Sequence, residues 1–557
     1  MPQHKLRAAL PAVLAAMPLV AAALRVLTTR APVWLWGDQA LIDIEARNSL
    51  LGRNLLGVYD RYGWHHLGPM WLLVLGAFRW LGPGSSASLV LGSYAVQVAA
   101  AAGIVVVAGR LRPGLTAWWV ALVLLGYEWA LGLERLGTVW APYAIALPTA
   151  LLVLLVADAV ASKDPWAPTI GAVVCATFLS QTDISTAVVV AVLLLATPLL
   201  RWAAHLQVGA RTEGRSALSR WHVEPGWGWS AGNWRLGAVA LVMVTVLLWL
   251  PPAVQQVSVR PGNVVSVYRF LRGHPGNHTW RMSLKALGTI FGAFPFRLGE
   301  QASSRDATPT WLVAGPAWEH LWYLAYLLVT LVAGMWAWVR RQRPAFSLAA
   351  ASCLAMLAAG LSAHLVYGPL YPYLVVWTGA LVVPAWAAWW LALAPPACSP
   401  KGGRAGALRR LAPMRRQAGL VAPLIALAAG VAVACAFVLA PVPMSGVPSL
   451  LAQRSWKAVA GAALAPGVRT IFVEIDNPDA MPDAAAIADQ AIRHGLRVEL
   501  NRAALYYLDP SFARRSVPQL SVAVCCGRGD PGLPPAGMTF RRKVGGQDIF
   551  TSGEVGG

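Results

Sequence analysis

Acidic and histidine side chains gather directly after the first apolar segment of the chain. Asp38 comes a few residues beyond that segment, and Asp60, Arg61, His65 and His66 follow before the next apolar stretch. So many ionisable groups between apolar segments cost free energy unless they pair or face an aqueous cleft. A carboxylate at such a cleft could take a proton from a reacting hydroxyl group, as a general base does. The alternative is a solvated loop whose long side chains extend into water.

The composition of the 557-residue chain predicts that lipid is its main solvent. Hydrophobic residues make up 57% of the chain and charged residues only 12%, about half the charged fraction of soluble domains. Several apolar runs reach roughly 20 residues, enough to cross ~30 Å of hydrocarbon. The basic residues behind the net charge of +21 lie mainly in short loops between these runs, as orientation signals do, so nucleic acid is not an expected partner. The abundance of alanine, glycine, valine and arginine favours a bacterial source.

Positively charged loops predict how the helices are oriented. Lys5 and Arg7 place the N-terminus in the cytoplasm. Four later basic loops fall on the same side only if Pro69–Leu81, which is about 13 residues long and carries Arg79, lies on the outer surface as an interfacial helix. The helices then expected to span are eleven, near residues 8–28, 86–109, 115–133, 139–162, 167–182, 185–201, 235–256, 318–339, 345–366, 371–394 and 419–441.

Two domains follow from this topology. Residues 1–441 form an all-α polytopic membrane domain with a first outer loop at 30–81 and a second outer segment at 257–317. Residues 442–557 form a small extracytoplasmic α/β domain, because short β-branched patterns alternate there with an amphipathic helix. The expected strands and helix are Thr470–Ile475, Asp483–His494, Arg497–Leu500 and Leu520–Val524. This domain lacks a glycine-rich phosphate loop, which favours an accessory or acceptor-binding role.

The order of these features resembles the GT-C superfamily of polytopic glycosyltransferases. An acidic residue follows the first helix, a Tyr- and His-containing stretch ends at Pro69, a short surface helix of the Pro-x-x-x-Leu-Leu type comes next, and a long helix ends in arginines. The superfamily includes protein O-mannosyltransferases, aminoarabinose transferases and bacterial arabinofuranosyltransferases, which use lipid-phosphate sugars. The resemblance covers residues 8–200 in its motifs and the rest of the chain in architecture only.

The resemblance implies roles for individual residues. Asp38 matches the first-loop carboxylate that is the family's catalytic base or lies at its centre. The family's histidine before the surface helix matches His65 or His66; the sequence reads His-His-Leu-Gly-Pro where relatives often have His-Pro-Pro, so both stay open. Glu134, beside Arg135, occupies the place of a second acidic residue between the third and fourth helices, where Asp is more usual.

Three further polar groups are candidates for binding the donor or the acceptor. Gln181 and Asp183 interrupt a long apolar run, although a turn there would be polar in any case. His364 and Tyr367 lie at another outer turn, where an aromatic belt is the alternative. An excess of arginine in 257–317 suits a lipid phosphate, which a guanidinium can bind with two hydrogen bonds; incidental surface charge is the alternative. The residues assigned to donor or acceptor binding are Asp60, Arg61, His65, His66, Arg135, Gln181, Asp183, Arg269, Arg272, Arg281, His364 and Tyr367.

Together these features predict an inverting membrane glycosyltransferase in the bacterial cytoplasmic membrane. It would transfer a sugar from a polyprenyl-phosphate donor to a cell-envelope glycan, lipid or protein acceptor on the outer face. No metal-ligand spacing appears, so the cofactor stays open, a divalent cation included. The alternatives are a polytopic lipid or polysaccharide transporter or flippase, which would favour broken or charged helices and repeated halves, and a non-catalytic envelope scaffold.

Overall fold

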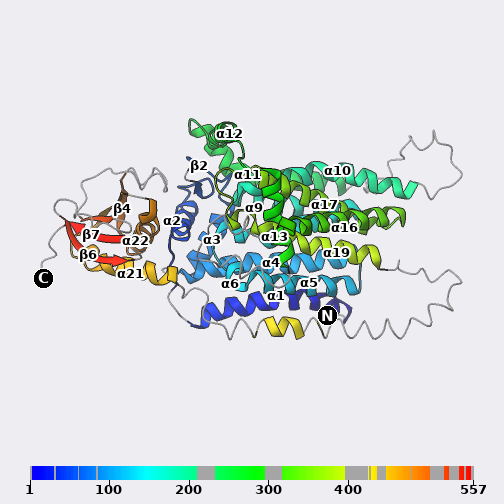
Figure 1. Cartoon of the computed structure of the whole chain (residues 1–557), viewed down its shortest axis with the longest axis horizontal. Helices are drawn as coiled ribbons and strands as arrows, with labels where there is room; N and C mark the ends of the chain where they lie inside the picture. Colours follow the sequence, from blue (N-terminus) through cyan, green and yellow to red (C-terminus); the bar gives the residue numbers. More distant parts are fainter. Residues whose placement is uncertain are drawn as a thin grey trace. The chain divides into compact units, whose positions relative to one another are not determined.

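The computed structural model places the chain in two compact units (Figure 1). Unit 1 comprises Met1–Ala23, Tyr94–Leu250 and His274–Leu439, and unit 2 comprises Leu24–Ser93, Pro251–Gly273 and Ala440–Gly557. The residues that the structure describes are 3–29, 33–60, 62–82, 86–209, 233–294, 317–394, 425, 428–433, 435, 447–476, 478–501, 520–525, 538–544 and 547–552.

Unit 1 is helical throughout its described parts. Helices α1, α4 and α11 each run from one unit into the other. The helices of unit 1, with these three, are α1 (Gln3–Thr29), α4 (Ala87–Leu111), α5 (Leu115–Leu131), α6 (Leu133–Leu136), α7 (Ala141–Ala144), α8 (Ala146–Ala161), α9 (Trp166–Thr182), η1 (Ile184–Thr186), α10 (Ala187–Gly209), α11 (Asn233–Ser258), α13 (Trp280–Ala293), η3 (Ala317–Glu319), α16 (His320–Val339), α17 (Arg343–His364), α18 (Pro372–Val375), η4 (Val376–Leu381) and α19 (Val382–Leu393).

Eight helices among the described residues are long and apolar enough to cross a membrane. They coincide with eight of the eleven predicted spans. The predicted spans at 115–133 and 167–182 form helices of 17 residues each, α5 and α9. The last predicted span, 419–441, lies mostly outside the described residues. The chain is therefore an integral membrane protein with several spanning helices, as its composition predicted.

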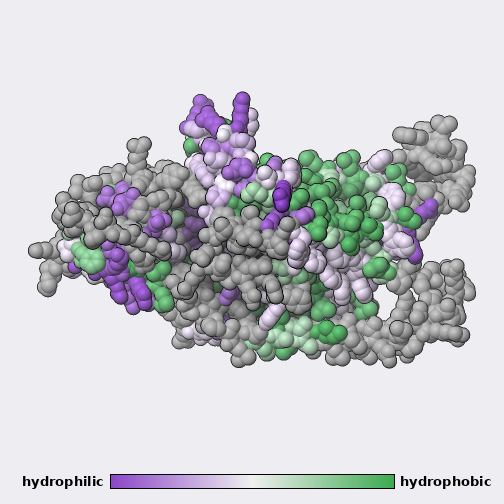
Figure 2. Space-filling model, viewed as in Figure 1, coloured by the Kyte–Doolittle hydropathy of each residue, from purple (hydrophilic) through white to green (hydrophobic). Residues whose placement is uncertain are grey.

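Burial separates the core of the membrane unit from its lipid-facing helices. In the apolar stretch of Ala141–Ala161, 89% of the residues are buried, whereas in that of Trp234–Ser258 only 11% are buried. Large hydrophobic side chains such as Leu195, Leu247 and Leu328 stay exposed on α10, α11 and α16, and Figure 2 shows the resulting hydrophobic surface over this part of the chain. Exposed apolar surface on this scale needs a hydrocarbon environment.

Unit 2 combines the segment after α1, a short helix at 263–273 and the C-terminal module. Its elements are α2 (Asp38–Leu50), β1 (Tyr59–Asp60), β2 (Trp64–His65), α3 (Met70–Leu81), α12 (Asn263–Gly273), α21 (Val447–Ala463), β3 (Thr470–Ile475), η5 (Pro478–Ala480), α22 (Met481–Arg493), β4 (Arg497–Leu500), β5 (Leu520–Cys525), β6 (Met538–Val544) and β7 (Gln547–Ser552). The short apolar helix predicted at Pro69–Leu81 is present as the 12-residue α3, which is too short to span.

The C-terminal module is an α/β fold, as its sequence pattern predicted. Its sheet has the order β4-β3-β5-β7-β6, in which β3 pairs in parallel with both β4 and β5. Strands β5, β7 and β6 pair in antiparallel fashion. Strands β6 and β7 were not predicted, because the exposed face of β6 is charged and carries no apolar alternation.

Candidate functional site

Asp38 is the first residue of α2. Gly37, just before it, has φ +58°, a left-handed backbone that favours glycine, and its N–H donates to the carbonyl of Pro482 over 3.3 Å. The Asp38 side chain is exposed. A carboxylate in the first turn of a helix also lies at the positive end of the helix dipole, which stabilises its charged form. This position suits a fixed anion that meets solvent or a ligand.

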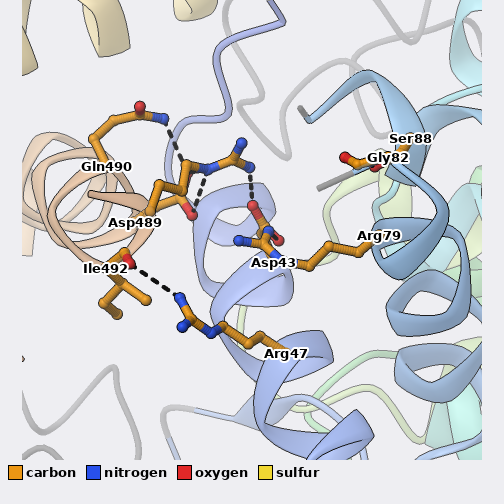
Figure 3. A network of polar contacts seen from close by, with 9 residues as sticks. Asp43, Arg47, Arg79, Gly82, Ser88, Asp489, Gln490 and Ile492 are labelled. Atoms are coloured by element: carbon orange, nitrogen blue, oxygen red, sulfur yellow. Dashed lines mark hydrogen bonds and ion pairs between the residues drawn. The ribbon is translucent and has the colours of Figure 1, made fainter. Parts of the chain in front are cut away.

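A buried charge network lies five residues further along α2 (Figure 3). Asp43 is fully buried and forms ion pairs with Arg79 of α3 and Arg493 of α22. Arg493 also donates from Nε to Asp489 over 2.9 Å. Burial lowers the pKa of Arg79 to about 10, and it raises the pKa of Asp489, an effect that Arg493 and Arg79 oppose.

This network differs from what spacing along one helix would favour. Asp43 precedes Arg47 by four residues, a spacing that favours an ion pair on the surface of α2. Instead Asp43 and Glu45 are both buried, Arg47 donates to the carbonyl of Ile492 over 3.0 Å, and Glu45 accepts from the N–H of Tyr59 over 3.1 Å. Spacing within one helix could not predict these partners, which come from distant parts of the chain.

The segment with Asp60 and the two histidines forms a β-hairpin. Tyr59–Asp60 pairs with Trp64–His65, Asp60 accepts from the N–H of Tyr62 over 2.9 Å, and Gly63 supplies the positive φ of the turn. The Asp60 side chain therefore shapes the turn. Arg61 lies outside the described residues.

Asn263 joins this hairpin to α12. The N–H of His65 donates to Asn263 Oδ1, and Asn263 Nδ2 donates to the carbonyl of His65, each over 2.8 Å. The ring of Phe270 stacks on Tyr62 with centroids 4.8 Å apart. The structure thus brings the hairpin histidines together with α12, the helix that carries Arg269 and Arg272.

The two histidines are held differently. His65 Nδ1 lies 3.0 Å from the carbonyl oxygen of Gly57, while the N–H of His66 donates to the carbonyl of Val58 over 3.0 Å and its ring meets Trp64 edge-on. Hydrogen bonding to one nitrogen fixes the orientation of an imidazole ring. The ring of His65 is therefore oriented directly by the backbone of Gly57.

Within unit 1, the acidic and amide candidates have structural contacts of their own. Glu134 is exposed on the short helix α6, and Arg135 donates to the carbonyl of Leu131 over 2.9 Å. Gln181 donates to the carbonyl of Leu248 over 2.8 Å. Asp183 caps η1 by accepting from the N–H of Ser185 over 2.9 Å. The Gln181 contact joins α9 to α11, whereas the Arg135 and Asp183 contacts each stabilise a single helix end.

A histidine and aromatic cluster forms where α13 begins and α17 ends. The ring of His364 stacks on Trp280 at 4.3 Å, and Tyr367 meets His274 edge-on at 4.8 Å. Burial lowers the pKa of the neighbouring His278, an effect that the backbone of Gly368 opposes. Arg281, next to Trp280, is exposed. The structure therefore brings His364 to the start of α13, the helix that carries Arg281.

Several residues of these sites were not found from the sequence. Asn263, His274 and Trp280 were not among the candidate residues drawn from the sequence. The pattern around residue 278 offered one signal, since three aromatic or histidine side chains crowd into a short polar segment between apolar helices. No group of three or more potential metal-ligating side chains occurs within the described ranges.

Comparison with known proteins gives no match in sequence but a clear one in structure. No family model matches the chain, and no curated protein matches it at a significant level. The crystal structure of ArnT from Cupriavidus metallidurans bound to undecaprenyl phosphate superposes with a TM-score of 0.54 at 14% identity, covering 96% of this chain and 98% of that one. The apo structure of ArnT gives a TM-score of 0.50 at 12% identity with the same coverage.

This likeness defines the class of fold. The chain has the polytopic membrane fold of GT-C-type glycosyltransferases, as the order of its motifs predicted. One solved structure that shares this fold over nearly the whole chain is that of ArnT, an aminoarabinose transferase.

The Asn263–His65 pair gives a direct test of how the hairpin is held. Asn263→Ala removes both partners of the His65 backbone, and an unsatisfied buried polar group costs about 1–3 kcal/mol. We expect faster amide hydrogen exchange in residues 57–66 and 263–273. Asn277→Ala, which alters an exposed side chain, should leave both segments unchanged. Equal exchange in the two variants would contradict the proposed anchoring.

Proposed function

We propose that this chain is a membrane glycosyltransferase that moves a sugar from a polyprenyl-phosphate donor to a cell-envelope glycan, lipid or protein acceptor. The observation that carries the proposal is Asp38, an exposed carboxylate at the first residue of α2. The shared fold supports it, because the ArnT structure of that fold is bound to undecaprenyl phosphate. A donor of this kind needs no nucleotide site.

The proposed reaction is a single displacement at the anomeric carbon. The acceptor oxygen forms a bond to that carbon while the bond from the carbon to the phosphate oxygen breaks. The hydroxyl proton passes to the carboxylate of Asp38, and the polyprenyl phosphate leaves as a monoester with its bonding electrons. Attack opposite the leaving group inverts the configuration of the sugar. General-base assistance of this kind contributes roughly 10²–10⁴-fold.

The departing phosphate gains charge, so cations beside it lower the barrier. Arg269 and Arg272 on α12 and Arg281 on α13 are exposed, and none of the three forms a salt bridge within the described ranges. Their guanidinium groups are therefore available to a phosphate. The aromatic and histidine rings beside Arg281 support a binding role for His364 and Tyr367.

We further propose that the N-terminus is cytoplasmic and that Asp38, 257–317 and the domain 442–557 lie outside the cytoplasmic membrane. The transmembrane domain would then be 1–441. The four basic loops support this orientation, since lysine and arginine accumulate in cytoplasmic loops. A polyprenyl-phosphate sugar would enter laterally from the outer leaflet.

One observation favours a second candidate, a lipid transporter. Glu128 of α5 is fully buried, and within the described ranges neither of its carboxylate oxygens has a hydrogen-bond partner. Ionisable groups in membrane helices often serve ion or proton pathways. The first candidate is preferred because Asp158, another acidic residue inside a predicted span, is paired with Arg110 and Ser162.

Asp38→Asn is the sharpest test of the base. The substitution keeps the shape of the side chain and removes its ability to accept the proton, so kcat should fall by about 10²-fold or more. The measurement is transfer of labelled sugar from a polyprenyl-phosphate donor by purified protein. Asp479→Asn, an exposed carboxylate of the C-terminal module, is the control and should keep normal turnover. Near-normal turnover of Asp38→Asn would place the base elsewhere.

The donor site predicts a different kinetic effect. Replacing Arg269, Arg272 or Arg281 by alanine should raise the donor KM and lower kcat to a smaller extent. The reason is that binding energy to the phosphate is lost both in the bound ground state and in the transition state. Arg542→Ala removes an exposed arginine of β6 and serves as the matched control. Unchanged kinetics in all three variants would remove these residues from the donor site.

The orientation is open to cysteine labelling in intact cells. Lys163 lies in the exposed turn between α8 and α9, and Asp479 is exposed in the C-terminal module. Asp479→Cys should react with a membrane-impermeant maleimide, whereas Lys163→Cys should react only after permeabilisation. The parent protein gives the background from native cysteines. The reverse pattern would invert the topology.

A further inference from the structure

We propose that α22 of the C-terminal module positions α2, and through it Asp38, for the transfer reaction. Arg493 and Asp483 are then positioning residues, although they follow Asp38 by more than 400 positions in the sequence. This inference rests on the proposed function of Asp38. It also gives the C-terminal module a task that its sequence did not reveal.

The first support is the register of the contacts between α2 and α22. Near the start of α2, Trp36 Nε1 donates to Asp483 over 3.2 Å; in its later part, Arg47 donates to the carbonyl of Ile492 over 3.0 Å. Asp43 pairs with Arg493 between these points. The contacts at the start of α2 reach Pro482 and Asp483, and the later ones reach Ile492 and Arg493. The two helices therefore run side by side in the same direction.

Contacts at both ends and in the middle fix the axial position of α2. The backbone contact from Gly37 to Pro482 lies directly before Asp38, and Asp43 follows it by about one and a half turns. A helix held at three levels can neither slide nor tilt without breaking a hydrogen bond. The position of Asp38 along the helix axis is therefore set by α22.

The same contacts fix the rotation of α2. At 100° per residue, Asp38 points about 140° away from Asp43 around the helix axis. Asp43, on the face toward Arg493, is completely buried, while Asp38 is exposed. Turning α2 so that Asp38 approached α22 would pull the Asp43 carboxylate out of its two ion pairs. The buried network thus fixes the direction in which Asp38 points around the axis of α2.

The contacts between α2 and α22 require particular side-chain types. Arg493 donates from Nε to both oxygens of Asp489 and from Nη2 to Asp43, a planar fork that lysine cannot reproduce. Asp483 accepts from Ser455 over 2.6 Å as well as from Trp36, which ties the start of α2 to helix α21. The contact between α2 and α22 therefore depends on the carboxylates of Asp43 and Asp483. Each of them accepts a hydrogen bond from a residue on the other side of that contact.

The test compares graded substitutions in the full-length protein. Arg493→Met removes the fork and Arg493→Lys keeps only the charge, while Trp36→Phe and Arg47→Met each remove one hydrogen bond and serve if Arg493→Met does not fold. Arg497→Met is the control, because Arg497 is 55% exposed and pairs with Glu499 within the module. The readouts are hydrogen exchange of residues 36–50 and, per folded protein, kcat and donor KM.

We expect Arg493→Met to speed exchange in residues 36–50 and to lower kcat about tenfold or more, since displacing a catalytic group by 1 Å can cost 10²-fold. The donor KM should change less than about twofold, and Arg493→Lys should recover part of the loss. Trp36→Phe and Arg47→Met should act in the same direction with smaller effects. The control should match the wild type.

Four outcomes would overturn the proposal in distinguishable ways. Unchanged exchange in residues 36–50 would mean that α22 does not hold α2. Faster exchange with normal kcat would mean that α22 holds the helix without positioning the base. Absence of transfer by the wild type and every variant would remove the proposed function itself, and the positioning role with it, whereas transfer lost only in Asp38→Asn would leave the function intact and reject the positioning residues.

Discussion

The ion pairs of the Asp43 carboxylate are the interaction on which the first-loop structure depends. A buried charge is tolerated only when partners compensate its desolvation, and breaking such a pair typically costs ~3–5 kcal/mol. Here the partners come from α3 and α22, so one carboxylate joins the short apolar helix, the helix that begins at Asp38 and the C-terminal module. The acidic residues Asp43 and Glu45 of α2 thus serve packing, whereas Asp38, at the start of the helix, is exposed.

Apart from this network, several candidate residues form two groups, one in each unit, and each group is held by short-range contacts. In unit 2, Asn263 and Phe270 join the histidine hairpin to a helix that carries two arginines. In unit 1, stacked rings join the start of α13 to the end of α17 beside Arg281. Both groups offer cationic and aromatic side chains, the types that bind a phosphate and a sugar ring.

Much of this organisation could be predicted from the sequence, because lipid imposes strict patterns. Apolar length predicted eight of the observed long helices, the positive loops required α3 to be a non-spanning helix, and β-branched alternation predicted strands β3, β4 and β5. The partners of Asp43, Glu45 and His65 could not be predicted, since they lie up to 450 residues away and local spacing favours neighbours on the same helix. The same limit hid Asn263, whose amide has no distinctive pattern around it.

The central claim is that the chain consumes a polyprenyl-phosphate sugar by breaking its glycosidic bond. The most direct measurement follows a labelled undecaprenyl-phosphate sugar, with the label in the sugar, in proteoliposomes that contain the purified protein and an envelope extract as acceptor. The claim predicts that undecaprenyl phosphate is released as the label moves to the acceptor. Movement of the intact labelled lipid across the bilayer, with no release of undecaprenyl phosphate, would contradict it and identify a transporter.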